Sequence, residues 1–262
     1  MHYLVILITA LVISAIGFRK FVWFISLGYG FSIAGIGLVM LLLYAGDLTW
    51  GTAVFCLLFI IYGCRLGGYL LIRERRSAAY NRKMKAEVND GSGMKMGLKF
   101  LIWISCAVLY TCEVSPVFFR LENGCGTDVA AVIGMVIMAG GLLMESASDR
   151  QKSNAKKERP DRFVDTGLFR MVRCPNYLGE ILIWTGVFVS GVNVLRGMQW
   201  AAAIAGYVCI VYIMFGGARR LELRQNRSYG DDPEYQAYVK KVPIILPGVP
   251  LYSVAKYKWL VG

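Results

Sequence analysis

The chain has 262 residues, and 56% of them are hydrophobic, a larger share than soluble domains usually carry. Several apolar runs reach the ~20 residues that cross a bilayer, so the composition predicts an integral membrane protein of one compact domain. The formal net charge of +12 would suit a nucleic-acid partner, but the placement of the basic residues argues against one.

Seven apolar spans are predicted, so the expected fold is all-α, a seven-transmembrane-helix bundle. In chain order, spans 1 to 7 cover roughly residues 2–18, 22–44, 50–72, 97–119, 128–148, 177–195 and 198–217. Span 1 lacks a basic region before its apolar run and a small-residue cleavage site after it. We therefore expect a transmembrane helix there, not a signal peptide.

Lysine and arginine concentrate in three segments with eight residues each, Arg73 to Lys99, Arg150 to Arg173 and Arg219 to Lys258. The loops expected on the other side of the membrane hold Arg120 and Arg196. This asymmetry predicts an outside N-terminus and cytoplasmic basic loops and C-terminus. Part of the basic surface is expected to rest on anionic lipid headgroups, and no nucleic acid is expected as a partner.

Cysteine and histidine give little support to metal or disulfide chemistry. The seven cysteines include no C-x-x-C pair, and five of them fall within apolar runs, as small hydrophobic residues do. The one histidine, His2, is terminal, which argues against histidine-based catalysis and a histidine-ligated metal. No G-x-G-x-x-G follows a strand and no Walker A motif is present, so no soluble nucleotide-binding fold is indicated.

The end of span 3 carries Tyr62, Arg65 and Tyr69 at i, i+3 and i+7, a spacing that places them on one helix face. An arginine with a turn or two of helix still to follow is expected to point into the bundle. The alternative is that the arginine snorkels to the cytoplasmic surface and the tyrosines belong to the interfacial belt.

Spans 5 and 6 repeat an i, i+4 pattern of polar residues. Glu145 and Asp149 share a face at the end of span 5, where like charges repel unless a cation or ligand lies between them. Alternatively, Asp149 pairs with Arg150 in the interface. At the start of span 6, Asn176 would also fit as a helix cap, whereas Glu180 is expected to face inward, because a carboxylate beside an apolar segment is costly when it faces lipid.

These polar groups are expected at one depth, the cytoplasmic ends of spans 3, 5, 6 and 7. Arg220 and Arg224 directly follow span 7. Arginines suit phosphates, and carboxylates with an asparagine suit ribose hydroxyls and amides. The helix that starts near Tyr177 adds a positive N-terminus. The pattern therefore favours a dinucleotide site beside a membrane-buried reaction site.

Between Gly167 and Glu180 the chain reads Gly-Leu-Phe and, after a few residues, Pro-Asn-Tyr-Leu-Gly-Glu. This stretch resembles the C-terminal region of the membrane steroid 5α-reductase family. The resemblance extends to Asp149, to Arg162 and to the pattern Tyr62-x-x-Arg65-x-x-x-Tyr69. It implies a seven-helix membrane enzyme that uses NADPH to reduce a carbon–carbon double bond conjugated to a ketone, as in a 3-oxo-4-ene steroid.

The resemblance also implies roles for single residues. Tyr62 would donate to the substrate ketone and stabilise the enolate that forms when hydride adds to the β-carbon. The family pairs this tyrosine with a glutamate on span 2, where this chain has no carboxylate. Glu113 in span 4 is our expected substitute. Cys174 stands where many relatives have histidine. The residues and the resemblance together predict this NADPH site: Arg65, Tyr69, Glu145, Asp149, Lys156, Arg162, Arg173, Asn176, Tyr177, Glu180, Arg220 and Arg224.

Residues 1–127, with spans 1 to 4, are expected to enclose the hydrophobic substrate, and residues 128–262 to bind the cofactor. One alternative is an isoprenylcysteine carboxyl methyltransferase-like enzyme using S-adenosylmethionine, which shares an Arg-x-Pro-x-Tyr-x-Gly element. Others are another lipid-modifying enzyme or a non-enzymatic transporter or scaffold. Asn176 and Glu180 favour the reductase, and polar groups gathered at one membrane face argue against a transporter, which binds near the midplane.

Two further expectations concern the cofactor and the location. The basic residues Lys156, Lys157 and Arg159 favour NADPH over NADH. Short loops and the lack of a targeting signal suggest the bacterial inner membrane as the location, with an endoplasmic-reticulum membrane as the alternative.

Overall fold

A computed structural model describes residues 1–76 and 93–260 of the chain. Within these ranges the fold is all-helical and contains no strand, which confirms the predicted all-α class. Five helices are long and apolar enough to cross a membrane by length and composition. Together with the apolar composition, these helices make the chain an integral membrane protein.

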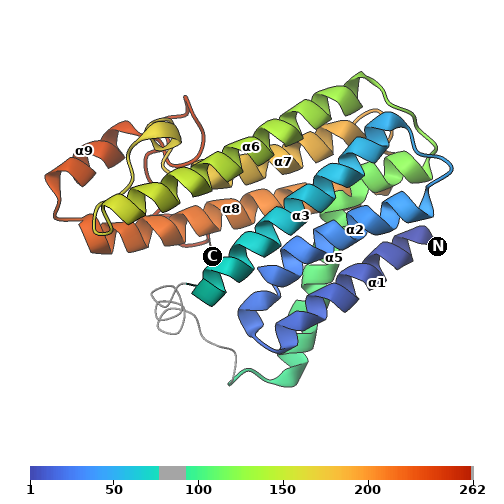
Figure 1. The fold of residues 1–262 in the computed structure, drawn as a ribbon, viewed down its shortest axis with the longest axis horizontal. Coiled ribbons are helices and arrows are strands. Elements are labelled where there is room, and N and C mark those ends of the chain that lie inside the picture. The colour runs from blue at the N-terminus through green and yellow to red at the C-terminus, as the bar shows by residue number, and fades with distance from the viewer. Residues whose placement is uncertain (77–92, 261–262) are drawn as a thin grey trace. The chain divides into compact units, whose positions relative to one another are not determined.

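The helices follow the predicted apolar spans in order (Figure 1). They are α1 His2–Ser14, α2 Leu27–Leu43, α3 Trp50–Arg76, α5 Met96–Glu122, α6 Val129–Glu158, α7 Pro175–Gly191, α8 Gln199–Tyr229 and α9 Pro233–Lys241. Short 3₁₀ turns lie at Ala15–Phe18, Phe21–Trp23 and Gly167–Arg170. Part of the first predicted basic segment, residues 77–92, lies outside the described residues.

Helices α6 and α8 continue beyond the predicted ends of their apolar spans, to Glu158 and Tyr229. The last turns of both helices are polar, so hydropathy marks where the membrane segment ends and not where the helix ends. The predicted polar tail contains a helix of its own, α9, which starts at a local signal. Asp232 caps it by accepting from the Glu234 backbone N–H at 2.8 Å, and Pro233 occupies the first turn.

The five helical segments that meet the span length are Phe21–Leu43, Trp50–Arg75, Met96–Glu122, Val129–Glu158 and Gln199–Tyr229. The apolar helix His2–Phe18 is shorter, and α7 has 17 residues. Length and composition therefore support five spans among the described residues, fewer than the seven predicted. The predicted orientation of the termini is not supported by these observations.

The chain divides into two compact units. Unit 1 comprises Met1–Met135 and Val187–Gly206, and unit 2 comprises Val136–Gly186 and Tyr207–Gly262. Helices α6, α7 and α8 each contribute residues to both units. The predicted division at residues 127 and 128 into a substrate-enclosing and a cofactor-binding part stays a prediction.

In unit 1, α2 lies between α1 and α3 (Figure 1). The backbones of α2 and α3 touch at Gly30 and Gly63. A Cβ atom added at Gly63 would lie 2.2 Å from the Gly30 carbonyl oxygen, so no larger residue fits there. Small residues of this kind let membrane helices approach closely, because packing and not the hydrophobic effect holds helices together in lipid.

Unit 1 also contains a fully buried arginine, Arg120, near the end of α5. Its Nη2 atom donates to Asp128 Oδ1 at 2.8 Å, its Nε atom donates to the Ser190 carbonyl oxygen at 3.1 Å, and Nη1 donates to the Gly126 carbonyl oxygen. The arginine thus caps the last turn of α7 and closes the loop before α6. Arg120 is one of the two basic residues expected in the sparsely charged loops, and these hydrogen bonds explain how its charge is accommodated.

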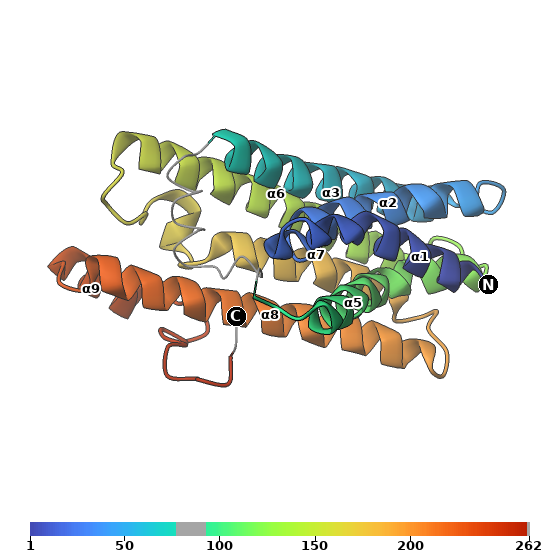
Figure 2. The same ribbon diagram turned by 90° about the horizontal axis from the view of Figure 1, so that it is seen from below.

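In unit 2, the first half of α7 lies between α6 and α8 (Figure 2). The loop before α7 pairs with the C-terminal tail through two backbone hydrogen bonds, Arg173 N–H to Pro243 O and Cys174 N–H to Ile244 O, both 2.9 Å. A hydrophobic core joins these elements. Its buried members are Val172, Cys174, Leu178, Ile181, Ala218, Leu221, Ile244, Ile245, Val254 and Leu260.

Candidate functional site

Two glycines bring α6 and α7 into backbone contact in unit 2. A Cβ atom at Gly179 would lie 2.8 Å from both the Glu145 amide nitrogen and the Gly141 carbonyl oxygen. A Cβ atom at Gly141 would lie 2.6 Å from the Gly179 carbonyl oxygen. The contact sets Glu145 beside the first turns of α7, which carry Asn176 and Glu180. The close packing of α6 against α7 therefore explains why the Pro-Asn-Tyr-x-Gly-Glu element has a glycine at position 179.

Both carboxylates at this contact are buried, with Glu145 6% and Glu180 5% exposed. The Trp184 indole N–H donates to Glu180 Oε1 at 3.0 Å, one helical turn further along α7. Burying two carboxylates in one unit is costly unless they have partners. Glu180 thus points inward, as the sequence predicted.

Asn176 and Tyr177 are half-buried at the start of α7. The Tyr177 ring packs against the hydrophobic core of unit 2 and lies next to α8, where its hydroxyl would be 3.4 Å from a Cβ atom at Gly217. Asp149 is half-buried on α6, one turn beyond Glu145. Five predicted cofactor residues therefore come from the α6–α7 pair of one unit: Glu145, Asp149, Asn176, Tyr177 and Glu180.

Lys156 and Arg162 hold the loop between α6 and α7. Lys156 Nζ donates to the Tyr229 hydroxyl at 2.8 Å and to the Pro160 carbonyl oxygen at 3.0 Å. Arg162 pairs with Asp165 at 3.0 Å and with Glu234 at the start of α9. Hydrogen bonds to Glu234 and then to Asp165 raise the pKa of Arg162. Both cations lie at the surface of unit 2, where an incoming phosphate could replace their carboxylate or hydroxyl partners.

Arg173 has a different environment, since its side chain is 1% exposed. Its Nη2 atom donates to Glu222 Oε1 at 2.9 Å, and the second oxygen of Glu222 accepts from the Val254 backbone N–H at 2.9 Å. The pair ties the entrance of α7 to α8 and to the C-terminal tail. This ion pair gives Arg173 a structural role without a ligand. The sequence offered no sign of it, because 48 residues separate the two side chains.

The remaining predicted cations and the remaining predicted tyrosine lie in two places. Arg220 and Arg224 are exposed at the polar end of α8 in unit 2. Arg65 and Tyr69 are half-buried on α3, in unit 1. The Arg73 guanidinium lies over the Tyr69 ring, 5.3 Å from its centroid, so this tyrosine is held by a neighbour one turn away.

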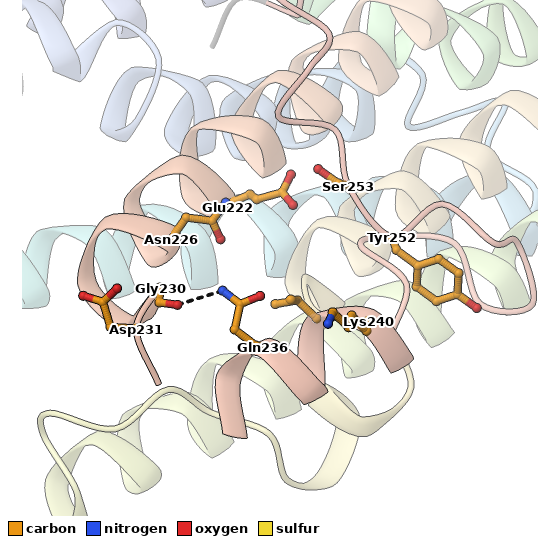
Figure 3. Close-up of a pocket in the computed structure, with 9 residues that line it drawn as sticks. Glu222, Asn226, Gly230, Asp231, Gln236, Lys240, Tyr252 and Ser253 are labelled. Atoms are coloured by element: carbon orange, nitrogen blue, oxygen red, sulfur yellow. Dashed lines mark hydrogen bonds between the residues drawn. The ribbon is translucent and has the colours of Figure 1, made fainter. Parts of the chain in front are cut away.

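A cavity of about 510 Å³ opens in unit 2 among the end of α8, α9 and the C-terminal tail (Figure 3). Its lining residues are Glu222, Asn226, Gly230, Asp231, Gln236, Val239, Lys240, Tyr252 and Ser253. Gln236 Nε2 donates across its wall to the Gly230 carbonyl oxygen at 2.8 Å. Sequence reasoning placed no functional residue at this cavity, and its lining carries both signs of charge.

The predicted catalytic residues belong to unit 1. Tyr62 is fully buried on α3, which excludes a position in a lipid-facing aromatic belt. Glu113 is 3% exposed on α5. The Tyr29 ring of α2 lies 6.1 Å from the Tyr62 ring and 5.0 Å from the Tyr110 ring of α5, measured between centroids. Three helices thus bring tyrosines together around Tyr29, a residue that sequence reasoning missed.

The family model described as "Protein of unknown function (DUF1295)" matches residues 12–242. Over 78 residues the chain is 37% identical to the steroid 5-alpha-reductase DET2 of Arabidopsis thaliana. That match covers 29% of this chain and 27% of the reductase, so the chain spans just over a quarter of that protein. No solved structure matches the chain. The chain is thus similar in part to a steroid 5α-reductase, and by a match over most of its length it belongs to the DUF1295 family.

Proposed function

We propose that this protein is an NADPH-dependent oxidoreductase that reduces a carbon–carbon double bond conjugated to a ketone in a hydrophobic substrate. A 3-oxo-4-ene steroid is the proposed substrate class. The observation that carries the proposal is the α6–α7 contact at Gly141 and Gly179, which holds the buried Glu145 and Glu180 beside Asn176. The partial similarity to a steroid 5α-reductase supports the same reaction class.

The side chains of unit 2 fit the chemistry of a dinucleotide. The carboxylates of Glu145 and Glu180 can accept from a carboxamide or from ribose hydroxyls, and Asn176 can both donate and accept. Lys156 and Arg162, with the exposed Arg220 and Arg224, supply cations for phosphate groups. Arg173 acts indirectly in this proposal, by fixing the start of α7 through Glu222. When bound, NADPH supplies a hydride.

Tyr62 is assigned to the substrate carbonyl. Negative charge builds on the carbonyl oxygen when hydride adds to the β-carbon, and a phenol donor in an apolar site stabilises that charge. The complete burial of Tyr62 supports this assignment, because water does not compete for its hydroxyl there. Glu113 remains the proposed second catalytic group. Residues 1–127 would enclose the substrate and 128–262 would bind the cofactor.

The proposed topology keeps seven spans, with the N-terminus outside and the C-terminus in the cytoplasm. A 17-residue helix such as α7 is about 25 Å long, near the short end of the range of transmembrane helices. The basic segments support the orientation. The short loops support the bacterial inner membrane as the proposed location.

NADPH oxidation by the detergent-purified protein, with and without progesterone as a 4-ene-3-oxosteroid, tests the proposal. Steroid-dependent oxidation with a saturated product is the expected result. NADPH binding without steroid turnover would retain the cofactor but reject the steroid class. Absence of NADPH binding would overturn the proposal, and methyl transfer from S-adenosylmethionine would then identify the methyltransferase-like alternative.

Two variants test the assigned cofactor residues in the same assay. Glu180→Gln and Asn176→Ala are expected to abolish NADPH-dependent turnover, because the first replaces an acceptor-only carboxylate by a neutral amide and the second removes the Asn176 amide. Asp231→Asn is the matched control, since it changes an exposed carboxylate outside the predicted site. Turnover by Glu180→Gln equal to that of Asp231→Asn would remove Glu180 from the site.

A further inference from the structure

Two buried phenol rings meet in the α2–α3 contact of unit 1. Tyr29 is 8% and Tyr62 0% exposed, and their rings lie 6.1 Å apart in an edge-to-face arrangement with an interplanar angle of 77°. Each tyrosine directly precedes one of the two glycines, Gly30 and Gly63, at which the helix backbones touch. Because neither glycine has room for a side chain, the register of the helices and hence the pairing of the rings is fixed.

A third tyrosine of this cluster has a structural task. The Tyr110 ring lies 5.0 Å from the Tyr29 ring, and its hydroxyl donates to the Phe24 backbone carbonyl oxygen. Tyr110 thereby anchors α5 to the turn before α2. Its ring also packs against Tyr29, so Tyr29 contacts the rings of both Tyr62 and Tyr110.

We propose that Tyr29 is the second hydroxyl donor to the substrate carbonyl and forms an oxyanion-binding pair with Tyr62. This inference rests on the proposed reductase function. A carbonyl oxygen has two lone pairs and can accept from both phenols at once. A neutral phenol can donate a hydrogen bond to the growing negative charge while keeping its proton.

In the reaction, the substrate β-carbon gains a hydride, with its two electrons, from NADPH. The electron pair of the carbon–carbon double bond moves to form the enolate, and the charge rests on the oxygen between the two phenols. Both phenols keep their protons and only donate hydrogen bonds. A proton from solvent then adds to the α-carbon, so that the products are the saturated ketone and NADP⁺.

The test is the single-turnover rate of NADPH oxidation with progesterone in the full-length protein, measured for Tyr29→Phe, Tyr62→Phe and Tyr110→Phe. Phenylalanine keeps each ring and removes only the hydroxyl. Loss of one oxyanion donor slows a reaction by about 10²-fold, so Tyr29→Phe and Tyr62→Phe are expected to fall by about that factor with unchanged NADPH affinity. Tyr110→Phe is the matched control: its ring still packs against Tyr29, so loss of its hydrogen bond to the Phe24 carbonyl oxygen is expected to lower the unfolding midpoint and to leave the rate close to that of the parent.

A second measurement separates a hydrogen bond to the substrate from a packing role. Replacing Tyr29 with a fluorinated tyrosine keeps the hydroxyl and lowers its pKa, so a donor to the enolate must show an altered rate. A parental rate for both this protein and Tyr29→Phe, with Tyr62→Phe slow, would overturn the role of Tyr29 and leave the reductase intact. If the parent protein does not oxidise NADPH with any enone, the proposed function fails, and the inference with it.

Discussion

Three buried charges illustrate how single side chains are stabilised within this helical membrane protein. Arg120 is paired with Asp128 and two backbone carbonyl groups, and Arg173 is paired with Glu222. Glu180 accepts from the Trp184 indole. The two arginines are explained by the fold, because their partners belong to neighbouring helices and loops. Glu180 and the carboxylate beside it, Glu145, are therefore the buried acidic groups with a proposed functional role.

Replacing Arg120 by methionine is expected to lower the stability of the protein by about 3 kcal/mol, because the Ser190 carbonyl oxygen loses a charged donor in a buried place. The measurement is the thermal unfolding midpoint in detergent. Arg196→Met is the control, since Arg196 belongs to the same unit and its side chain is exposed. Equal midpoints for the two variants would contradict the structural role of Arg120.

Cys174 occupies the position before Pro175 where the resembling family often has histidine. Burial raises the pKa of the Cys174 thiol to about 12, so almost no reactive thiolate exists at pH 8. We expect Cys174 to resist alkylation by iodoacetamide in the folded protein, while Cys125, in the loop between α5 and α6, reacts faster. Mass spectrometry of the modified peptides measures both rates. Equal modification before unfolding would show that Cys174 is accessible.

At the scale of the elements, close helix contacts position both halves of the proposed chemistry. Gly141 and Gly179 join α6 to α7 in unit 2, and Gly30 and Gly63 join α2 to α3 in unit 1. In each contact the residue next to a glycine has a proposed functional role, as Glu180 follows Gly179 and Tyr62 precedes Gly63. Helix backbones in contact form a rigid support, which suits residues that must be held to a fraction of an ångström.

A pair of adjacent glycines on α6 tests this point. In Gly141→Ala the new methyl group would meet the Gly179 backbone at 2.6 Å, so we expect α6 and α7 to separate and NADPH binding to weaken by at least about tenfold. Gly140→Ala points into open space and is expected to be neutral or slightly stabilising, because alanine favours helix. Isothermal titration with NADPH compares the two, and a similar affinity in both would contradict the packing argument.

At the scale of the whole molecule, the distribution of charge predicts which loops face which side of the membrane. The last turn of α6 carries Lys156 and the loop after it carries Arg162, whereas the loop between α5 and α6 contains Cys125 and little charge. Arg120, which would break the asymmetry, is neutralised inside unit 1. The charge distribution therefore fits the proposed orientation, with Arg196 as the remaining exception.

Membrane-impermeant maleimide applied to intact cells tests the orientation. Cys125 is expected to be labelled from outside, and an Asp161→Cys variant, which replaces an exposed residue of the basic loop, only after the membrane is opened. Labelling of Asp161→Cys in intact cells, with Cys125 protected, would reverse the proposed topology. Labelling of both from outside would contradict the number of spans between them.

The sequence by itself determined the helical class and the order of the apolar helices, because hydropathy and helix signals act over neighbouring residues. It also predicted that Glu180 points inward, since burying a carboxylate against lipid is too costly without a partner. It did not reveal that α6 and α8 continue into polar turns, because hydropathy indicates which residues lie in the membrane and not where a helix ends. The roles assigned to the site residues stay predictions.

Only the tertiary structure decided which distant side chains meet. Arg173 and Glu222 form an ion pair, Arg120 reaches the end of α7, and Tyr29 lies against Tyr62. Each of these contacts depends on the register in which two helices pack, and a register is set by the fit of many side chains and not by any local pattern. For the same reason, only the tertiary structure explains why position 179 is a glycine, because the backbone of Gly141 packs directly against it.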